Sequence, residues 1–253
     1  MSTTTQIEND LTASDRICVA LDNMDAMGAW RIAEQLKNKV GWLKIGMELF
    51  TLGGPKFLGN LKTIGHRIFL DLKYHDIPNT VYGAVTRAAE NGVAMLNVHA
   101  AGGPEMLKAA AEAAMNAKTT RKPLVIGVTF LTSLSDDDLN NFLGFKGTSQ
   151  EFVLKMAKAC FDAGLAGVVA SPNDAKVLRE EFGPDFIIVT PGIRPLWAGK
   201  KGDQKRVSTP SRAIGDGSSL LVIGRPIHGA DNPVVAVKKI SDEIAEALRI
   251  NIK

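Results

Sequence analysis

The sequence predicts a (β/α)8 barrel, the TIM-barrel fold, built as a single domain. Eight short apolar segments alternate with helical patterns at intervals of about 25 to 30 residues, which is typical of a parallel sheet. Glycine or proline separates nearly every pair of neighbouring segments. Eight such units within 253 residues, with no linker between them, favour closure into one barrel over an open sheet.

The expected strands are short apolar runs, and most of them end close to a polar residue or a glycine. They cover residues 17–22, 42–46, 68–73, 95–100, 124–130, 167–171, 186–191 and 220–225. The expected helices follow the apolar periodicity of residues 30–36, 55–61, 79–91, 105–117, 150–163, 173–182 and 232–249. Pro55 suits a first helical turn, and Gly92 suits the end of the helix before it.

Composition limits the classes of function. The chain is 45% hydrophobic and 23% charged, with a net charge of +3 and scattered basic residues, so neither nucleic acid nor a membrane surface is an expected partner. Cys18 and Cys160 form no disulfide framework or metal motif, which suits a reducing compartment. Residues 1–14 form a polar arm without a secretory signal, and residues 15–253 form the barrel domain. We therefore expect a cytoplasmic protein.

The third strand carries an unusual set of charges. Asp71 and Lys73 lie on the same face of this otherwise apolar strand, and Asp76 follows just before Ile77-Pro78 turns the chain away. Ionised groups at the mouth of a buried sheet are costly unless they pair or take part in chemistry. The stretch therefore predicts either a catalytic charge cluster or a structural ion pair.

Other polar residues stand where the expected strands end. In a (β/α)8 barrel the active site lies at the carboxyl ends of the strands, so these side chains are expected to converge on one face. They are Asp22, Lys44, Asp71, Lys73, His99, Thr129, Thr132, Ser171 and Arg225. His99 is more typical of a packed or hydrogen-bonded structural group than of a general base, and Thr132 could equally cap a helix.

The loops after the seventh and eighth strands predict a phosphate site. Gly224 allows the backbone to approach an anion, and Arg225 offers a fork of donors that matches phosphate oxygens. Residues 194–206, rich in Gly, Lys and Arg, have the composition of a lid that closes over the phosphate, although a solvated surface loop has the same composition. No metal-binding or dinucleotide-binding motif is present, so no metal and no cofactor are expected.

An ordered set of motifs resembles the orotidine 5′-monophosphate decarboxylase family, in its bacterial type. The signature is Asp71-Leu-Lys73-Tyr-His-Asp76-Ile-Pro-Asn-Thr80. It is accompanied by Lys44-Ile-Gly-Met-Glu48, Asn97-Val-His-Ala100, Val128-Thr-Phe-Leu-Thr-Ser133, Thr190-Pro-Gly-Ile-Arg194 and Gly202-Asp-Gln204. The resemblance covers essentially the whole chain, and it implies cofactor-independent conversion of orotidine 5′-monophosphate to UMP, the last step of de novo pyrimidine synthesis.

The resemblance also implies roles for individual residues. Lys73 would protonate C6 of the pyrimidine, beside Asp71 and Lys44, while Asp22 and Lys44 would bind the ribose and Thr132 the pyrimidine edge. Gln204, Gly224 and Arg225 would hold the phosphate, with Arg194 beside them. The implied active unit is a homodimer in which Asp76, Ile77 and Thr80 reach the neighbouring subunit's site.

Three alternatives stay open at this point. The same barrel superfamily contains Mg²⁺-dependent sugar-phosphate decarboxylases and aldolases, which share the Asp-x-Lys-x-x-Asp pattern. Lys44 or Lys73 could instead form a Schiff base, as in a class I aldolase. A barrel that binds a phosphorylated ligand without catalysis is the third alternative, because a fold alone does not establish activity.

Overall fold

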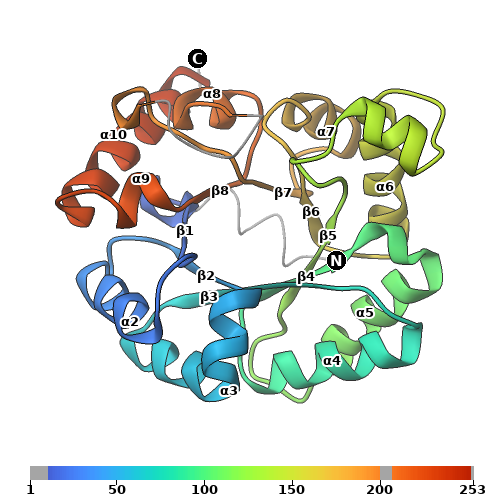
Figure 1. Cartoon of the computed structure of the whole chain (residues 1–253), viewed down its shortest axis with the longest axis horizontal. Coiled ribbons are helices and arrows are strands. Elements are labelled where there is room, and N and C mark those ends of the chain that lie inside the picture. Colours follow the sequence, from blue (N-terminus) through green and yellow to red (C-terminus); the bar gives the residue numbers. More distant parts are fainter. Residues whose placement is uncertain (1–10, 200–206, 252–253) are drawn as a thin grey trace.

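The computed structural model describes residues 11–199 and 207–251, and within them eight parallel strands close into a barrel (Figure 1). Each strand pairs with its neighbours in the sequence, and β1 pairs with β8 to complete the ring. The strands are β1 (Ile17–Ala20), β2 (Trp42–Gly46), β3 (Arg67–Tyr74), β4 (Met95–His99), β5 (Leu124–Val128), β6 (Gly167–Val169), β7 (Ile187–Thr190) and β8 (Leu220–Ile223). The predicted (β/α)8 fold is confirmed.

The helices surround the ring of strands, as Figure 1 shows, and every strand is followed in the chain by at least one helix. They are α2 (Ala26–Gln35), α3 (Met47–Ile64), α4 (Pro78–Glu90), α5 (Pro104–Asn116), α6 (Ser149–Asp162), α7 (Ala175–Phe182), α8 (Pro210–Gly215), α9 (Arg225–His228) and α10 (Pro233–Asn251). Four shorter helical turns are η1 (Ser14–Arg16), η2 (Ala100–Gly102), η3 (Asp138–Phe142) and η4 (Leu196–Ala198).

Two helical regions differ from the prediction. Helix α3 begins at Met47 instead of Pro55, and it is kinked at Gly54, whose φ of 57° and ψ of −164° lie outside the helical region. Pro55 therefore begins the second segment of a longer helix. Helices α8 and α9 had no predicted position, since each is only one or two turns long and carries too few apolar residues to show a period.

The hydrophobic residues form two layers. The inner faces of the strands fill the barrel with residues such as Trp42, Phe69, Met95 and Ile126. The outer faces pack against the helices in a larger cluster, in which Leu43, Leu70 and Leu96 are buried. This alternation along each strand follows from the two-residue period of a β-strand.

The inner faces of the first strands change from apolar to polar along the chain direction. On the inner side of β1, Cys18 and Ala20 are followed by Asp22, and on β2, Trp42 is followed by Lys44. On β3, Asp71 follows Phe69. Because the strands are parallel and in register, these polar residues arrive together at the carboxyl end of the barrel.

The opposite end of the barrel is closed by apolar and paired groups. Leu11 packs against the inner cluster, and the guanidinium of Arg67 lies over the ring of Trp42 and 2.8 Å from the carboxylate of Asp15.

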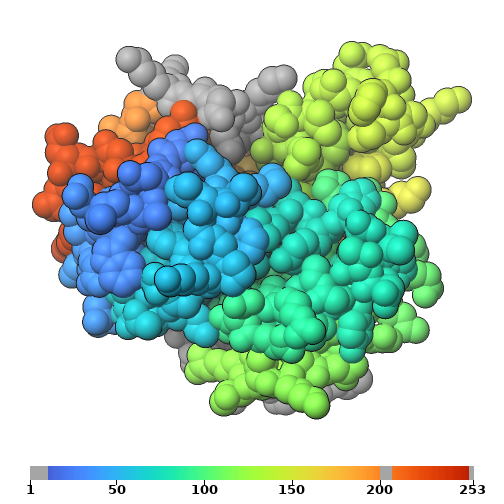
Figure 2. All heavy atoms as spheres, turned by 60° about the horizontal axis from the view of Figure 1, so that its bottom comes forward, coloured from blue at the N-terminus to red at the C-terminus, as the bar shows by residue number. Residues whose placement is uncertain are grey.

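In Figure 2 the yellow-green segment between β5 and α6 projects from the body of the molecule. No helix in the described ranges is long and apolar enough to cross a membrane.

Candidate active site

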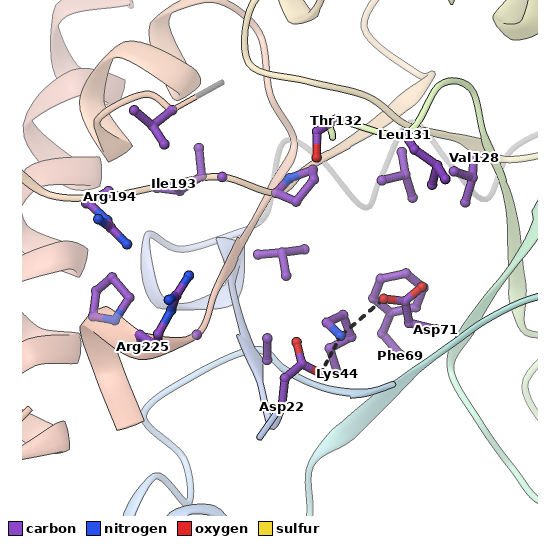
Figure 3. Close-up of a pocket in the computed structure, with 18 of the residues that line it drawn as sticks. Asp22, Lys44, Phe69, Asp71, Val128, Leu131, Thr132, Ile193, Arg194 and Arg225 are labelled. Carbon is purple, nitrogen blue, oxygen red and sulfur yellow. Dashed lines mark hydrogen bonds and ion pairs between the residues drawn. The ribbon is translucent and has the colours of Figure 1, made fainter. Parts of the chain in front are cut away.

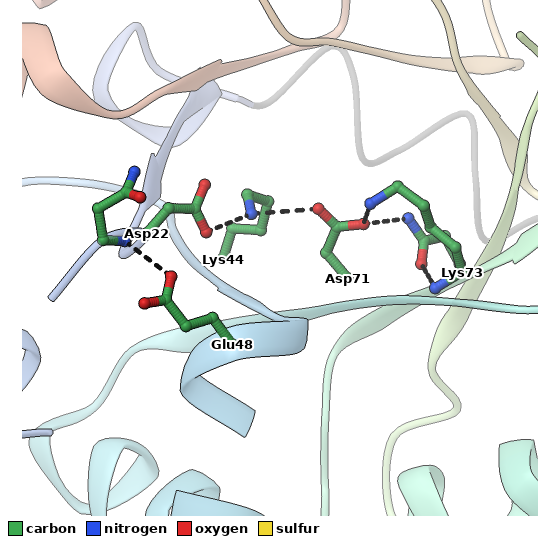
Figure 4. A network of polar contacts seen from close by, with 7 residues as sticks. Asp22, Lys44, Glu48, Asp71 and Lys73 are labelled. Carbon is green, nitrogen blue, oxygen red and sulfur yellow. Dashed lines mark hydrogen bonds and ion pairs between the residues drawn. The ribbon is translucent and has the colours of Figure 1, made fainter. Parts of the chain in front are cut away.

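Four charged side chains of alternating sign lie in a row at the carboxyl end of the barrel (Figure 4). The ammonium of Lys44 lies 2.9 Å from Asp22 Oδ1 and 3.1 Å from Asp71 Oδ2. The ammonium of Lys73 lies 2.7 Å from the other oxygen of Asp71. The row Asp22–Lys44–Asp71–Lys73 therefore joins the ends of three neighbouring strands, β1, β2 and β3.

Lys44 is the most deeply buried member, with 6% of its surface exposed. Burial of an ammonium lowers its pKa, but the attraction of Asp71 and Asp22 outweighs this effect and the pKa of Lys44 is raised. The side chain therefore stays charged, and the two carboxylates offset a desolvation cost of several kcal/mol.

Asp71 is held as an anion by its surroundings. Burial raises the pKa of this carboxyl group, but the charges of Lys44 and Lys73, together with hydrogen bonds from Lys73 and Asn97, lower it to about 2. Each carboxylate oxygen of Asp71 faces a different ammonium. The site therefore contains a fixed negative charge next to the ammonium of Lys73.

Close approach of the first two charged residues requires a glycine at position 46. A Cβ atom on Gly46 would lie 2.9 Å from Asp22 Oδ1 and 3.3 Å from Lys44 Nζ. Either separation is tighter than an ordinary contact, so a side chain here would displace the ion pair. Gly46 ends β2 and leaves this space open.

The backbone at Lys73 is strained. Its φ is 51°, in the left-handed region, which costs a non-glycine residue roughly 1–2 kcal/mol. The pairing of β3 with β4 shifts register between Leu70 and Tyr74, so the strand bulges where Asp71 and Lys73 lie. The backbone N–H of Lys73 donates to the side-chain Oδ1 of Asn97, at 2.8 Å. Strain of this kind is frequent at functional sites.

A pocket opens above this row of charges (Figure 3). Asp22, Lys44 and Asp71 lie on one side of it, while Arg194 and Arg225 lie on another. Its apolar surface is contributed mainly by the second half of the barrel, through Val128, Phe130, Leu131, Val169, Pro191, Ile193 and Val222. Thr132, Gly224, Pro226 and His228 also line it. The pocket thus combines an apolar wall with the row of charges on one side and two arginines on another.

The predicted lid is fixed at its base. Ile193 and Ser208 form an isolated parallel bridge, in which Arg194 N–H donates to Ser208 O at 2.8 Å and Ser208 N–H donates to Gly192 O at 3.2 Å. The two ends of the segment therefore meet beside the pocket. Leu196 in η4 is 88% exposed. Gln204, predicted to bind phosphate, lies outside the described residues.

The three residues predicted to act across a subunit interface lie outside this pocket. Asp76, Ile77 and Thr80 are exposed, Ile77 by 67%, at the start of α4. The carboxylate of Asp76 accepts a hydrogen bond from the N–H of Ile77 at 2.7 Å. Among the ion pairs of the described residues, none joins Asp76 to Lys73 of the same chain.

Three polar residues that were expected to converge with the others do not line the pocket. The hydroxyl of Thr129 donates to the carbonyl of Val169, and that of Ser171 donates to the carboxylate of Asp174. His99 stacks on His75 with 5.2 Å between ring centroids, and its Nδ1 accepts from Ala101 N–H. These residues stand at the carboxyl ends of β4, β5 and β6, as predicted, but not in the wall of the pocket, and the contacts of His99 agree with a packed, hydrogen-bonded group.

Two further residues belong to the site although the sequence analysis gave them no role. Asn97 bonds Asp71 and Lys73; it begins the motif Asn97-Val-His-Ala100, and it is an amide within the apolar run Leu96-Asn97-Val98. His228 lines the pocket from α9. Burial lowers the pKa of His228, while nearby Asp22 raises it and Arg225 lowers it, and the net shift is downward. Nothing in the sequence around His228 marked it.

The fold and the site define the class of protein. This is a (β/α)8-barrel enzyme, with a row of alternating charges on one side of its pocket and two arginines on another. Within the described parts of the chain, no cluster of three or more His, Cys, Asp or Glu side chains is placed to hold a metal ion.

Comparison with known proteins assigns the family. Residues 15–240 match the model of the orotidine 5′-phosphate decarboxylase / HUMPS family, and the chain belongs to this family. It is 46% identical to the orotidine 5′-phosphate decarboxylase of Moorella thermoacetica, over 92% of this chain and 93% of that protein. It is 48% identical to the enzyme of the same name from Hydrogenovibrio crunogenus, over 90% of this chain and 95% of that protein. The crystal structure of orotidine 5′-phosphate decarboxylase from Lactobacillus acidophilus superposes with a TM-score of 0.81 at 38% identity, covering 90% of this chain and 98% of that one.

Proposed function

We propose that this protein is a carboxy-lyase that converts orotidine 5′-monophosphate to UMP and carbon dioxide without a cofactor. The observation that carries the proposal is the row of ion pairs Asp22–Lys44–Asp71–Lys73, in a pocket that also contains Arg194 and Arg225. Membership of the family and the names of the relatives support the substrate.

The chemistry explains why an ammonium is needed. When the bond between C6 and the carboxylate breaks, the electron pair stays on C6 in the plane of the ring, where the π system cannot delocalise it. Lys73 stabilises this charge as it develops, because its ammonium is already in position. It then donates a proton to C6 to give UMP, and the resulting amine takes a proton from solvent.

The residue type follows from the same reasoning. An arginine could pair with Asp71 equally well, but its guanidinium is a poor proton donor. Asp71 holds the Lys73 ammonium in place through the 2.7 Å ion pair, and we assign Asp71 a position against the substrate carboxylate, where like charges favour loss of carbon dioxide. Lys44 and Asp22 are assigned to the ribose hydroxyls, and Thr132 to the pyrimidine edge.

The phosphate is assigned to the arginine side of the pocket. Arg225 and Gly224 follow β8, and Arg194 stands at the base of the segment 194–206, which we propose closes as a lid and brings Gln204 to the phosphate. Charge-assisted hydrogen bonds from arginine suit phosphate oxygens. Binding energy from this distant group can organise the reacting end of the site.

We also propose that the active unit is a homodimer with two shared sites. Asp76, Ile77 and Thr80 are exposed and lie outside the pocket of their own chain, which leaves them accessible to a partner subunit. In the dimer, Asp76 would place a second carboxylate beside the partner subunit's active-site ammonium. The two cysteines are both free and buried, which supports a cytoplasmic location.

A direct assay tests the activity. The protein is incubated with orotidine 5′-monophosphate after EDTA treatment, and the loss of substrate absorbance and the appearance of UMP are followed. Turnover that EDTA leaves unchanged is expected. Turnover that Mg²⁺ restores, or turnover of a hexulose phosphate instead, would favour the sugar-phosphate alternative.

Subunit mixing tests the shared site. Inactive Lys73→Ala and Asp76→Ala proteins are combined under conditions of subunit exchange, and the mixed dimer should hold one intact site, giving about a quarter of the parent activity. A mixture of Lys73→Ala with Lys44→Ala is the matched control, because both of its sites stay damaged. No recovery in the first mixture, with exchange demonstrated, would refute the shared site.

A further inference from the structure

We propose that Asn97 is a positioning residue. It holds the backbone of Lys73, and the Asp71 carboxylate that pairs with the Lys73 ammonium, in the reacting geometry. This inference rests on the proposed function for its kinetic consequences. Asn97 stands in the middle of β4 on its inner face and is 1% exposed. Among the described residues, no hydrogen bond joins the Asn97 side chain to Arg194, to Arg225 or to the apolar residues that line the pocket.

The oxygen and the nitrogen of the Asn97 side-chain amide both form hydrogen bonds to β3, the strand that carries Asp71 and Lys73. Its Oδ1 accepts the backbone N–H of Lys73 at 2.8 Å, and its Nδ2 donates to Asp71 Oδ1 at 2.7 Å. The partners fix the orientation of the amide, since a backbone N–H only donates and an ionised carboxylate only accepts. The oxygen of Asp71 that receives Asn97 is also the oxygen that receives Lys73.

The hydrogen bond from Lys73 N–H to Asn97 Oδ1 lies where the regular pairing of β3 with β4 is interrupted. Three non-glycine residues in the described ranges have positive φ, namely Asn23, Asn38 and Lys73. Asparagine tolerates this conformation, whereas lysine does not favour it. The register of β3 against β4 shifts between Leu70 and Tyr74, and the Asn97 side chain fills the bulge and takes the Lys73 N–H. The strained conformation that directs the Lys73 side chain therefore depends on Asn97.

The residue type is specific. An aspartate would lose the donor to Asp71 and add a second negative charge beside it. A leucine of similar shape would leave the Lys73 N–H and one lone pair of Asp71 without partners in a buried site. Only an amide of this length supplies one acceptor and one donor in the required directions.

Three variants separate positioning from general stability. Asn97→Leu removes both bonds, and Asn97→Asp removes one in a pH-dependent way. Ser219→Ala is the matched control, because Ser219 is also buried and also bridges a backbone N–H, that of Ile188, and a cation, Arg179, but at the opposite end of the barrel. For each variant kcat, KM, UMP affinity and melting temperature are measured.

Asn97→Leu should lower kcat by about 100-fold, the loss expected when a reacting group is misplaced by about 1 Å. Its KM and UMP affinity should change by less than about threefold, because the ligand-binding arginines are untouched. Ser219→Ala should lose stability and keep kcat. A kcat for Asn97→Leu within threefold of the parent, or a parallel loss in Ser219→Ala, would overturn the proposal.

The pH profile of Asn97→Asp gives a readout that a structural role would not produce. When protonated, the introduced carboxyl group again offers a carbonyl oxygen to the Lys73 N–H and a hydroxyl to Asp71. The charged groups around it are Asp71 and Lys73 on β3, Lys44 on β2 and His99 on its own strand. Asp71 favours the protonated form and the cations oppose it. Activity relative to the parent should therefore rise as pH falls from about 8 to 5, and that of Asn97→Leu should stay flat. A flat profile for both variants would count against the proposal.

A crystal structure of Asn97→Leu tests the geometry without substrate. The proposal predicts that Lys73 leaves its positive φ or that its ammonium moves away from Asp71. An unchanged Lys73 would overturn it, whatever the activity of the parent protein. Absence of orotidine 5′-monophosphate turnover by the parent would instead refute the proposed function and leave this structural test in force.

Discussion

The two halves of the barrel contribute different things to one pocket. Strands β1 to β4 carry their polar groups on the strands themselves, where Lys44 and Asn97 are buried and hydrogen-bonded. Strands β5 to β8 present an apolar wall, and their cations, Arg194 and Arg225, stand on the segments that follow the strands. The proposed reacting groups thus stand on or next to strands, and the proposed anion-binding groups stand on the segments that follow strands.

The largest expected effect removes the reacting group of the first half. Lys73→Ala should lower kcat by at least about 10⁴-fold, since it removes both the electrostatic stabilisation and the proton donor. Lys73→Arg should not restore turnover, because arginine keeps the charge without the acidity. UMP affinity, measured by calorimetry, should change by less than about tenfold. A kcat within tenfold of the parent would remove Lys73 from the mechanism.

The next effect lies in the second half. Arg225→Ala should lower kcat/KM by about 100-fold, because charge-assisted hydrogen bonds to a phosphate contribute about 1.5–3 kcal/mol each. The melting temperature should stay close to that of the parent. Orotidine, which lacks the phosphate, supplies the control, and Arg225→Ala and the parent should process it equally slowly. An equal loss with both substrates would mean that Arg225 acts on the reacting end.

A smaller effect concerns stability in acid and belongs again to the first half. The pKa of Asp71 falls from its ordinary value of 3.8 to about 2 in the folded protein. Its contribution is therefore present above about pH 4 and is lost as pH falls toward 2, and it amounts to about 2 kcal/mol. Urea unfolding between pH 5 and pH 2.5 should show a steeper loss for the parent than for Asp71→Asn. Equal slopes would contradict the coupling of Asp71 to the two lysines.

The smallest effect tests that stability and turnover are separable. Thr148 and Glu151 form a capping box at the start of α6, in which Thr148 Oγ1 accepts Glu151 N–H and Glu151 accepts Thr148 N–H. Thr148→Ala should lower the free energy of unfolding by about 1 kcal/mol. Its kcat should equal that of the parent at a temperature where both are folded. A large loss of kcat would show that the segment between β5 and α6 shapes the pocket more than its contacts indicate.

The difference between the halves also explains what the sequence could predict. Asp22, Lys44, Asp71 and Lys73 were predictable because each interrupts or ends an apolar strand, and parallel strands bring such positions together. The barrel followed from the alternation of apolar strands and helical patterns. Short elements such as α8 and α9 have too few residues for a period to be visible.

Other features depend on geometry that no local pattern encodes. The positive φ of Lys73 and the bulge of β3 arise from pairing with β4, and the role of Asn97 is visible only once that bulge is formed. Thr129 and Ser171 were expected at the carboxyl end of the barrel with the other polar residues, and there their hydroxyls bond to nearby groups and do not line the pocket. A hydroxyl at a strand end is ambiguous, since it can satisfy its own bonds locally.

The proposed mechanism requires the ammonium of Lys73 to be in place before the substrate arrives. Crystal structures of the protein alone and with UMP would show whether it is. We predict that the Lys73 ammonium stays paired with Asp71 in both and lies within about 3.5 Å of C6 when UMP is bound. A Lys73 side chain that turns away from the pocket without UMP, or a C6 atom that faces another group, would contradict the account.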